Sequence, residues 1–497
     1  MPFNKTCSDN SLFTSERFIK LLSLIAFATL LFSAKLWLIC SYGNPTPFWD
    51  QWDAEAAKLY APFLEGTLHL QDLFSAHNEH RIFTTRLLSL AELKVNGVWS
   101  PILQMVVNAV LHIIVLILII ILMLKVVGQK YLFPILIFSL ILFSMPYAFE
   151  NTLEGFQAQF YFVLFFSIVA LWLMVTKPPF SVLWWVGLAS SGVAYFSFAS
   201  GIFSIAASVG VSLILYCVSD LRHSKKQILA IFVLIVAFVL GVLFTPVSPK
   251  MHPPLPIIHA LFAILSWPFN KYSILFLLVN APAIIFLSNM YRHRPHASDP
   301  RWFIVGLLIW AAIQSISIAY GRYEAPLSSR YMDLYAILIL INFICLLLVL
   351  NPPRLRDSRF NFKMLGGVFW VLVILIPLVE GSHTSLRYAK GLYQKGLEQQ
   401  INTQNYVATG NINFLKNKPD LSIPYPNPDR LAMLLSKPSI RSILPSNIAS
   451  PELKKDGNLD AFITNLLMNY KIFLYAGLMF LILAMTCSAF RCKRKFP

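Results

Sequence analysis

The chain has 497 residues, of which 57% are hydrophobic and only 13% are charged, and its mean hydropathy is +0.65. Soluble domains carry about 25% charged residues, so this composition disfavours a soluble, a disordered or a nucleic-acid-binding protein. The 40 Lys and Arg residues outnumber the 23 Asp and Glu residues and give a net charge of +17, but they lie in short clusters between long apolar runs. This distribution is typical of the cytoplasmic loops of membrane proteins. The composition therefore predicts an all-α, multi-pass membrane protein with a lipid bilayer, and no nucleic acid, as its partner.

Twelve apolar runs are long enough to cross a bilayer, which requires about 20 residues per helix. They lie at 18–40, 101–125, 131–149, 156–176, 180–199, 201–218, 228–246, 272–290, 302–320, 332–350, 363–380 and 469–489. Only Ser200 and Gly201 separate the fifth run from the sixth, so the sequence leaves open whether these two are full crossings. The stretch 256–269 is apolar but short, and it predicts an interfacial or re-entrant helix.

Basic residues concentrate in alternate loops, for example Lys225 with Lys226 and Arg292 with Arg294. Because cytoplasmic loops carry an excess of Lys and Arg, this bias predicts which loops face the cytoplasm. The sequence thus predicts an integral protein of the inner or plasma membrane, with both termini in the cytoplasm.

Two hydrophilic segments, 41–100 and 381–468, fall on the external side in this topology. We expect a transmembrane bundle over 1–380 that includes the external loop 41–100, a small external or periplasmic cap over 381–468, and a last helix with a basic cytoplasmic tail over 469–497. Within the first loop, apolar residues recur at helical spacing around Leu59 and again around Leu87. This spacing predicts two amphipathic helices that lie on the membrane surface.

Asp50 and Asp53 follow the first apolar run. Asp50 lies between Trp49 and Trp52, and Asp53 directly follows Trp52. Their spacing places both carboxylates on one face if a helix starts there. Partial desolvation at a membrane boundary raises the pKa of a carboxylate towards that of a useful general base. The alternative is that one of the two acids only caps a helix, while the tryptophans form an interfacial belt.

A second polar cluster in the same loop reads His77-Asn-Glu-His-Arg81. Two imidazoles, a carboxylate and a guanidinium beside amphipathic segments indicate a patch that faces a substrate, with Glu79, His80 and Arg81 in contact with it. A solvated loop is the alternative. Two histidines at this spacing could chelate a metal, but no third ligand accompanies them, so we predict no metal site.

A third cluster lies in a short external loop and contains Arg322, Arg330 and Tyr331. Guanidinium groups with hydroxyls nearby are suited to binding a phosphate or diphosphate at the membrane surface. The alternative is that the arginines pair with Glu324 or with the acids of the first loop.

Four further polar residues lie where the third run ends and the fourth begins, on the same external face as the three clusters. They either line one cavity with those clusters or cap the two helix ends: Glu150, Glu154, Gln157 and Gln159. Lys35 and His112 lie inside apolar runs, where we expect a snorkelling lysine and a packed core histidine. The chain contains no nucleotide-binding loop and no dinucleotide fingerprint, so we predict no cofactor.

These features together resemble the C-type (GT-C) membrane glycosyltransferases, which have many membrane helices, a long first external loop with two helices and an acid just after the first helix. The pair Asp50 and Asp53, the segment His77-Asn-Glu-His-Arg81 and the segment Ser329-Arg330-Tyr331 are similar to segments of bacterial members that use polyprenyl-phosphate sugars.

The resemblance implies that the protein moves a sugar from a polyprenyl phosphate to a hydroxyl of a glycan, lipid or protein acceptor on the external face, with inversion. Asp50 or Asp53 would accept the proton of that hydroxyl. Arg322 and Arg330, with Arg81 as a further candidate, would stabilise the departing lipid phosphate. Glu79 would orient the acceptor or the sugar.

Three other classes of protein remain as alternatives. A secondary transporter or lipid flippase requires ionisable residues near the middle of the membrane. An O-antigen polymerase or ligase takes a lipid-diphosphate donor and has a large late external loop, which the segment 381–468 resembles. A purely structural membrane subunit leaves the clustered external arginines unexplained.

Overall fold

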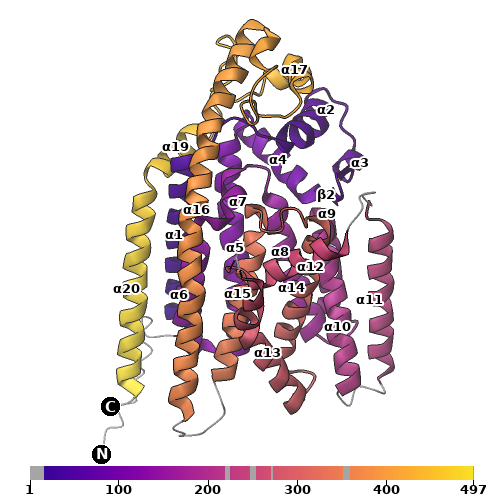
Figure 1. The fold of residues 1–497 in the computed structure, drawn as a ribbon, viewed down its shortest axis with the longest axis vertical. Helices are drawn as coiled ribbons and strands as arrows, with labels where there is room; N and C mark the ends of the chain where they lie inside the picture. Colours follow the sequence, from indigo (N-terminus) through magenta and orange to yellow (C-terminus); the bar gives the residue numbers. More distant parts are fainter. Residues whose placement is uncertain (1–15, 219–223, 247–252, 270–271, 351–358, 496–497) are drawn as a thin grey trace, which may run out of the picture.

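The computed structural model describes residues 16–218, 224–246, 253–269, 272–350 and 359–495. These residues form an all-α multi-pass membrane protein, with long helices side by side and a smaller polar domain at one end of them (Figure 1). The described residues contain two strands, β1 (Ala76–His77) and β2 (His80–Arg81). The predicted terminal segments at 1–15 and 496–497 lie outside the described residues. Glu16 and Arg491 are joined by a hydrogen bond of 2.7 Å, so the first and last helices have their outer ends on the same side of the molecule.

By length and composition, ten helices of the described chain can cross a membrane. They are α1 (Glu16–Tyr42), α5 (Pro101–Val127), α8 (Ala158–Thr176), α10 (Phe203–Val218), α11 (Lys225–Leu243), α13 (Phe276–His293), α14 (Arg301–Gly321), α15 (Met332–Leu350), α16 (Arg359–Thr409) and α20 (Tyr470–Lys495). Short 3₁₀ turns adjoin α10, α13 and α15, namely η5 (Ala199–Ile202), η7 (Ser273–Leu275) and η8 (Ser329–Tyr331).

The remaining apolar helices are bent or short. The turn η3 (Gln129–Tyr131) with α6 (Leu132–Ser144), and η4 (Pro146–Ala148) with α7 (Phe149–Leu153), form a pair bent by 41°, which counts as an eleventh span if it crosses as one unit. Helix α9 (Val182–Ser197) has 16 residues, and α12 (Pro254–Ser266), in the stretch predicted to be interfacial or re-entrant, has 13. Every one of the twelve predicted runs is therefore helical, and ten or eleven of the helices are long enough to span.

Burial separates central from peripheral helices. The main hydrophobic core joins α1, α5, α6, α8, α14 and α15, and α15 is the most deeply buried of the long helices. Helices α13 and α16 also supply residues to this core, for example Phe286 and Trp370. On the rest of their surface they expose large apolar side chains, as do α11 and α20; examples are Phe232, Ile284, Phe369 and Ile482. Apolar surface of this kind on a spanning helix is suited to contact with lipid tails.

The polar domain consists of residues 43–100 and 399–459, which come from both hydrophilic segments. Its helices are η2 (Gln51–Tyr60), a π-helix, with α2 (Ala61–Leu64), α3 (Leu70–Leu73), α4 (Phe83–Asn96), η9 (Ile412–Phe414), α17 (Pro428–Ser436) and α18 (Pro438–Arg441), and α19 (Asp460–Met468) leads into α20. Trp52, Tyr60 and Trp99 of the first segment share one core with Leu431 and Leu434 of the second. The two segments therefore fold together.

This shared core corrects the prediction that the first amphipathic helix lies on the membrane. Residues 51–64 are helical as predicted, but Ala56, Leu59 and Tyr60 are buried in the core of the polar domain. The apolar face is covered by the protein itself, because the late segment supplies matching apolar side chains. Part of the second predicted helix, α4, contributes to the same core through Phe83 and Leu90.

Helix α16 corrects the predicted boundary at residue 380. It runs without interruption for 51 residues, from the membrane body into the polar domain (Figure 1). Beyond residue 380, Leu386, Ala389 and Leu392 continue an apolar stripe that packs against Trp37 and Tyr42 of α1. Since this stripe keeps helical spacing, the helix continues and joins the two predicted units.

Candidate functional site

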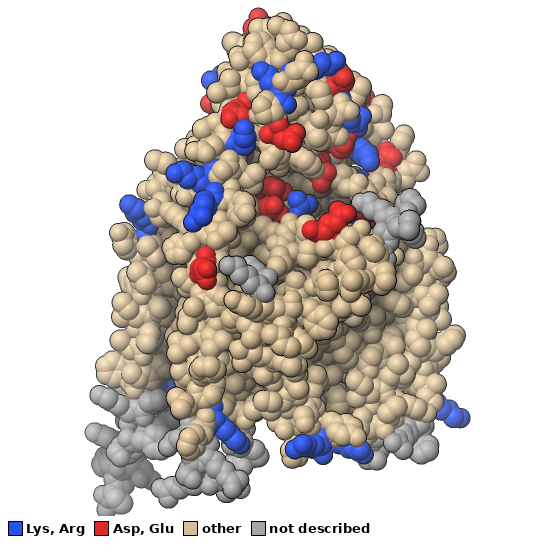
Figure 2. All heavy atoms as spheres, viewed as in Figure 1, with Lys and Arg blue, Asp and Glu red and all other residues tan. Residues whose placement is uncertain are grey.

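A cavity of about 400 Å³ lies where the polar domain meets the membrane helices. Five of the predicted site residues line its polar end: Glu79, His80, Arg322, Arg330 and Tyr331. The wall deeper in the bundle is mostly apolar and includes Val163, Leu164, Ile202, Phe203 and Trp310. Figure 2 shows acidic and basic atoms together in a hollow below the polar domain, above a broad uncharged band. The cavity therefore combines a charged end with an apolar interior.

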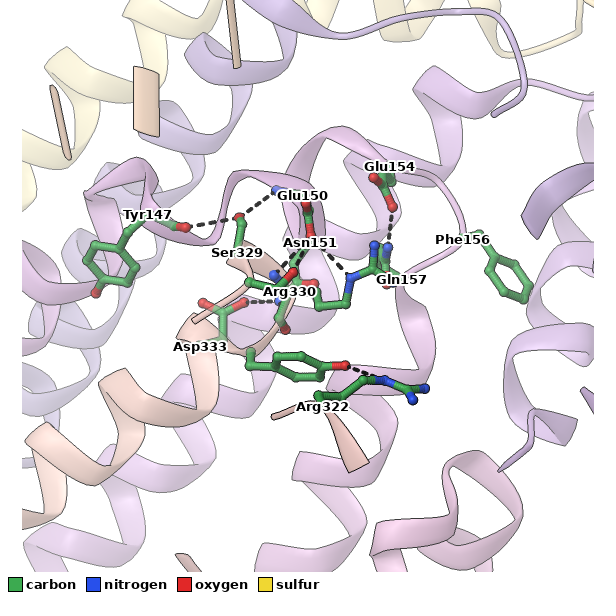
Figure 3. A network of polar contacts seen from close by, with 12 residues as sticks. Tyr147, Glu150, Asn151, Glu154, Phe156, Gln157, Arg322, Ser329, Arg330 and Asp333 are labelled. Carbon is green, nitrogen blue, oxygen red and sulfur yellow. Dashed lines mark hydrogen bonds and ion pairs between the residues drawn. The ribbon is translucent and has the colours of Figure 1, made fainter. Parts of the chain in front are cut away.

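Arg330 is held at the polar end of the cavity by bonds to η4 and α7, which follow the bend after α6. It lies in the turn η8, and its Nε and backbone N–H both donate to Glu150 Oε2, at 3.2 and 3.1 Å (Figure 3). Ser329 Oγ accepts the N–H of Glu150 at 3.1 Å and donates to the Tyr147 carbonyl at 2.9 Å. These bonds lock η8 against α7. The partner of Arg330 is thus Glu150, which is neither Glu324 nor an acid of the first loop.

Arg322 reaches the same cavity from the end of α14. Its Nε donates to the Tyr331 hydroxyl at 3.3 Å, and its Nη2 lies 3.5 Å from Glu79 Oε2. The predicted alternative, pairing with an acid of the first loop, therefore holds for Arg322. Burial pushes the pKa of Glu79 upwards, but its own backbone N–H and the charge of Arg322 outweigh burial, and the net pKa is below the ordinary value. Glu79 is therefore ionised at neutral pH.

A two-stranded hairpin carries Glu79 and His80 to the cavity. In β1 and β2, His77 pairs with His80, and Asn78 occupies the turn with a φ of +51°, a conformation that asparagine tolerates. The His80 ring lies against Phe198, with ring centroids 3.7 Å apart. Burial lowers the pKa of His80 to about 4, so this imidazole is neutral at physiological pH and can offer hydrogen bonds rather than charge.

Arg81 does not line the cavity. Its Nη1 donates to the Tyr195 hydroxyl at 3.0 Å and to the Phe244 carbonyl at 2.7 Å. These two bonds tie the hairpin to α9 and to the end of α11. Arg81 therefore anchors the hairpin, whereas the resemblance had made it a further candidate, after Arg322 and Arg330, for stabilising the lipid phosphate.

Glu154 and Gln157 lie near Arg330 and Glu150 (Figure 3). Glu154 accepts a hydrogen bond from the Gln157 side chain, and with Glu150 it lines a second, smaller cavity of about 50 Å³. Burial, followed by the charge of Glu150, raises the pKa of Glu154 to about 7, while Arg330 acts in the opposite direction and Asp50 adds to the rise. Glu154 is thus poised to exchange a proton near neutral pH.

Asp50 lies at the start of η2 and faces the hairpin. Its Oδ1 is 3.7 Å from His77 Nε2, and its side chain is 39% exposed. Asp50 makes no side-chain capping bond to η2, so the alternative of a simple helix cap does not describe it. Asp50 is outside the lining of the main cavity, and its charge acts on Glu154.

Asp53 faces a different part of the molecule from Asp50. Its Oδ1 accepts from Arg430 Nε at 2.6 Å, and its Oδ2 accepts from the Tyr425 hydroxyl. The two acids therefore do not share the one face that α-helical spacing had predicted. The chain forms a π-helix here, whose turn is wider than that of an α-helix. Asp53 therefore joins the two halves of the polar domain.

The sequence analysis named Lys35 and His112 but missed Asp333, with which they form a buried ionisable cluster in the membrane body. Lys35 is 5% exposed and donates to Thr152 Oγ1 at 3.0 Å, so it does not snorkel. His112 is fully buried, and its Nε2 lies 3.7 Å from Oδ1 of Asp333, which lines the main cavity. Asp333 follows Arg330 by three residues at the start of an apolar run, and that position was the signal available in the sequence.

No three His, Cys, Asp or Glu side chains in the described parts of the chain are placed to hold a metal ion. Comparisons with protein-family models, with curated proteins and with solved structures give no match. The evidence for function therefore comes from the site itself.

Proposed function

We propose that this protein is a membrane glycosyltransferase that moves a sugar from a polyprenyl phosphate to a hydroxyl of an envelope glycan, lipid or protein. The observation that supports it best is the main cavity, with Arg322 and Arg330 at one end and apolar walls between membrane helices. A polyprenyl phosphate has the same division, with an anionic group on an apolar chain. Each part of such a donor matches the part of the cavity that its chemistry favours.

The two arginines keep donors for a phosphate although both have acidic partners. A guanidinium carries five N–H groups, and within the described residues Glu150 accepts only the Nε–H of the Arg330 side chain. Arg322 is 41% exposed and its contact with Glu79 is long, at 3.5 Å. Both side chains can therefore add bonds to a lipid phosphate without losing their positions.

In the proposed reaction, the acceptor oxygen attacks the anomeric carbon of the sugar. The bond between that carbon and the phosphate oxygen breaks, and polyprenyl phosphate leaves with the bonding electrons, stabilised by Arg322 and Arg330. Asp50 takes the hydroxyl proton, and one displacement inverts the anomeric carbon. We assign the base to Asp50 rather than Asp53, because Asp53 is already bonded to Arg430 and Tyr425.

We place the site on the external face of the inner or plasma membrane, with both termini in the cytoplasm. The support is the distribution of basic residues: Lys225, Arg292, Arg301 and Arg491 lie at helix ends away from the polar domain. Figure 2 shows basic atoms along that end of the molecule. Such an excess is typical of cytoplasmic loops.

A transfer assay with labelled polyprenyl-phosphate sugars in purified membranes tests the proposal. We expect Asp50→Asn and Arg330→Ala to lower the transfer rate about 100-fold or more, which is typical of a lost general base or a lost charge at the leaving group. Asp53→Asn, the matched control, is expected to stay within about tenfold of wild type. Full activity in both Asp50→Asn and Arg330→Ala would refute the assigned roles.

A second candidate function is a secondary transporter or lipid flippase, which the buried Lys35, His112 and Asp333 favour. Proteoliposomes separate the two. A transferase forms product only when an acceptor is present, whereas a flippase moves labelled lipid across the bilayer without one. Comparing monophosphate with diphosphate donors separates the proposed reaction from that of an O-antigen polymerase or ligase.

A further inference from the structure

Two opposite charges lie buried in the membrane body beneath the Arg330 site. Lys35 comes from α1 and Asp333 from α15, and the negative charge of Asp333 acts on Lys35 across a gap. His112 lies beside the acid, with its Nε2 3.7 Å from Asp333 Oδ1. Lys35 is 5% exposed and Asp333 is 3% exposed. Buried charges are costly unless each is compensated, so these two residues depend on one another.

Both charges also bond to the same short helix, α7. Lys35 Nζ donates to Thr152 Oγ1 at 3.0 Å, and Asp333 Oδ2 accepts from Asn151 Nδ2 at 2.9 Å. The same Asn151 amide donates to the Arg330 carbonyl at 3.0 Å (Figure 3). Helix α7 is therefore bonded to α1 through Lys35 and to α15 through Asp333.

Helix α7 needs such support because of its length and its position. It has five residues, which is too few for a helix to be stable without outside contacts, and it follows a sharp bend after α6. Yet its first turn carries Glu150, which binds both the backbone and the side chain of Arg330. A small movement of α7 would therefore move the guanidinium at the polar end of the cavity.

We propose that Lys35 and Asp333 form a positioning pair that fixes α7 and, through Glu150, the guanidinium of Arg330. The functional consequence, correct placement of a phosphate ligand, rests on the proposed function. Lys35 is outside the lining of the main cavity, so its effect on the site passes through α7, whereas Asp333 also lines that cavity. The pair acts through charge compensation, so losing one member is more harmful than losing both.

Hydrogen–deuterium exchange of the full chain in nanodiscs tests the pair without any substrate. We expect Lys35→Met and Asp333→Asn to speed exchange about tenfold or more in peptides covering 146–156 and 327–333, with little change in the rest of the bundle. The double variant Lys35→Met/Asp333→Asn is expected to exchange more slowly than either single variant, because neither charge is then left uncompensated, but faster than wild type, because the bond from Lys35 to Thr152 is lost.

Asn342→Leu is the matched control, since Asn342 is also a buried polar residue of α15 and bonds to Asn280 at 3.2 Å, away from the cavity. It should leave exchange at 146–156 unchanged. Uniform acceleration across the bundle in the single variants, or a double variant as fast as the faster single, would overturn the pair.

A transfer assay on the same variants separates this inference from the proposed function. We expect the single variants to lose kcat/KM for the lipid donor about tenfold or more, with partial recovery in the double variant, whereas a merely structural pair would change only thermal stability. If wild type transfers no sugar, the proposed function fails, and the exchange experiment alone still decides whether the pair positions α7.

Discussion

Glu55 is a buried carboxylate of the polar domain with no basic partner among the residues that the structure describes. Its Oε1 accepts from Ser89 Oγ and from Gln104 Nε2, both at 2.7 Å, and its Oε2 accepts from Gln51 and Trp99. Burial raises the pKa of Glu55, and the four hydrogen bonds oppose that rise. The negative charge of Glu55 acts on nearby Glu92. Oε1 of Glu92 is buried and has no hydrogen-bond partner in the described chain.

Glu92 makes the stability of the polar domain depend on pH. Burial, followed by the charge of Glu55, raises its pKa from 4.5 to about 8. Because the folded state then binds the proton more tightly than the unfolded state, the stabilisation is complete below about pH 4.5 and is lost as the pH rises to about 8. We expect the Glu92 side chain to account for a loss of about 5 kcal/mol over this range, since each pKa unit is worth about 1.4 kcal/mol.

The pH dependence of thermal unfolding in nanodiscs checks this expectation. Glu92→Gln should flatten the curve and raise the unfolding temperature at pH 8, because the amide stays neutral. The exposed Glu452→Gln serves as the control and should follow wild type. Parallel curves for wild type and Glu92→Gln would contradict the assignment.

The hairpin β1–β2 is the element that joins the polar domain to the cavity. Its turn brings Glu79 and His80 to the polar end, and Arg81 ties it to Tyr195 and the Phe244 carbonyl. The turn depends on Asn78, whose φ of +51° suits glycine and asparagine but not a β-branched side chain. The geometry of the site is therefore sensitive to a residue that does not line the cavity.

Two substitutions at Asn78 test this element. Asn78→Gly should leave donor binding unchanged, because glycine adopts the same backbone angles. Asn78→Val should weaken binding of a polyprenyl phosphate about tenfold, because a strain of about 1–2 kcal/mol favours a shifted hairpin. Equilibrium binding to protein in nanodiscs measures both, and equal affinities for the two variants would show that the hairpin tolerates the strain.

At the scale of the whole molecule, the polar domain is assembled from segments that lie far apart in the chain. Asp53 and Arg430 are separated by 377 positions and bond across its middle, next to the core formed by Trp52, Leu431 and Leu434. Both side chains are only partly buried. The apolar core therefore supplies most of the free energy that holds the two segments together, and the partly exposed ion pair adds a smaller share.

The variant Arg430→Ala measures how much the ion pair with Asp53 contributes to the stability of the polar domain. We expect a loss of about 1 kcal/mol, the usual size for a partly exposed pair, seen as faster hydrogen exchange in 428–449. Lys416→Ala is the control, because Lys416 pairs with Asp429 inside the late segment itself, at 2.8 Å. Equal exchange in the two variants would mean that the Asp53 contact adds nothing to the docking of the segment.

The sequence predicted the membrane helices well, because lipid requires long apolar runs wherever the chain crosses. It also selected five residues that the fold brings to one cavity, since charged groups in external loops stand out against an apolar background. Their partners could not be predicted: Glu150 lies 180 positions from Arg330, and tertiary packing alone brings them together.

Local pattern also failed where an apolar face had two possible partners. The stripe at Ala56, Leu59 and Tyr60 suits a membrane surface as well as a protein core, and only the late segment decides between them. Lys35 was misjudged for a related reason: a lysine in an apolar run can snorkel or pair, and its bond to Thr152 is a tertiary contact.

The uninterrupted helix α16 has a mechanical consequence. Its 51 residues correspond to a rod of about 75 Å, longer than the bilayer is thick, so one continuous helix connects the membrane helices to the polar domain. If the rod pivots at its membrane end, a tilt of about 10° displaces its tip by about 13 Å. Pro377 lies inside this helix, and because proline lacks the N–H that would bond to the preceding turn, the helix bends most easily there.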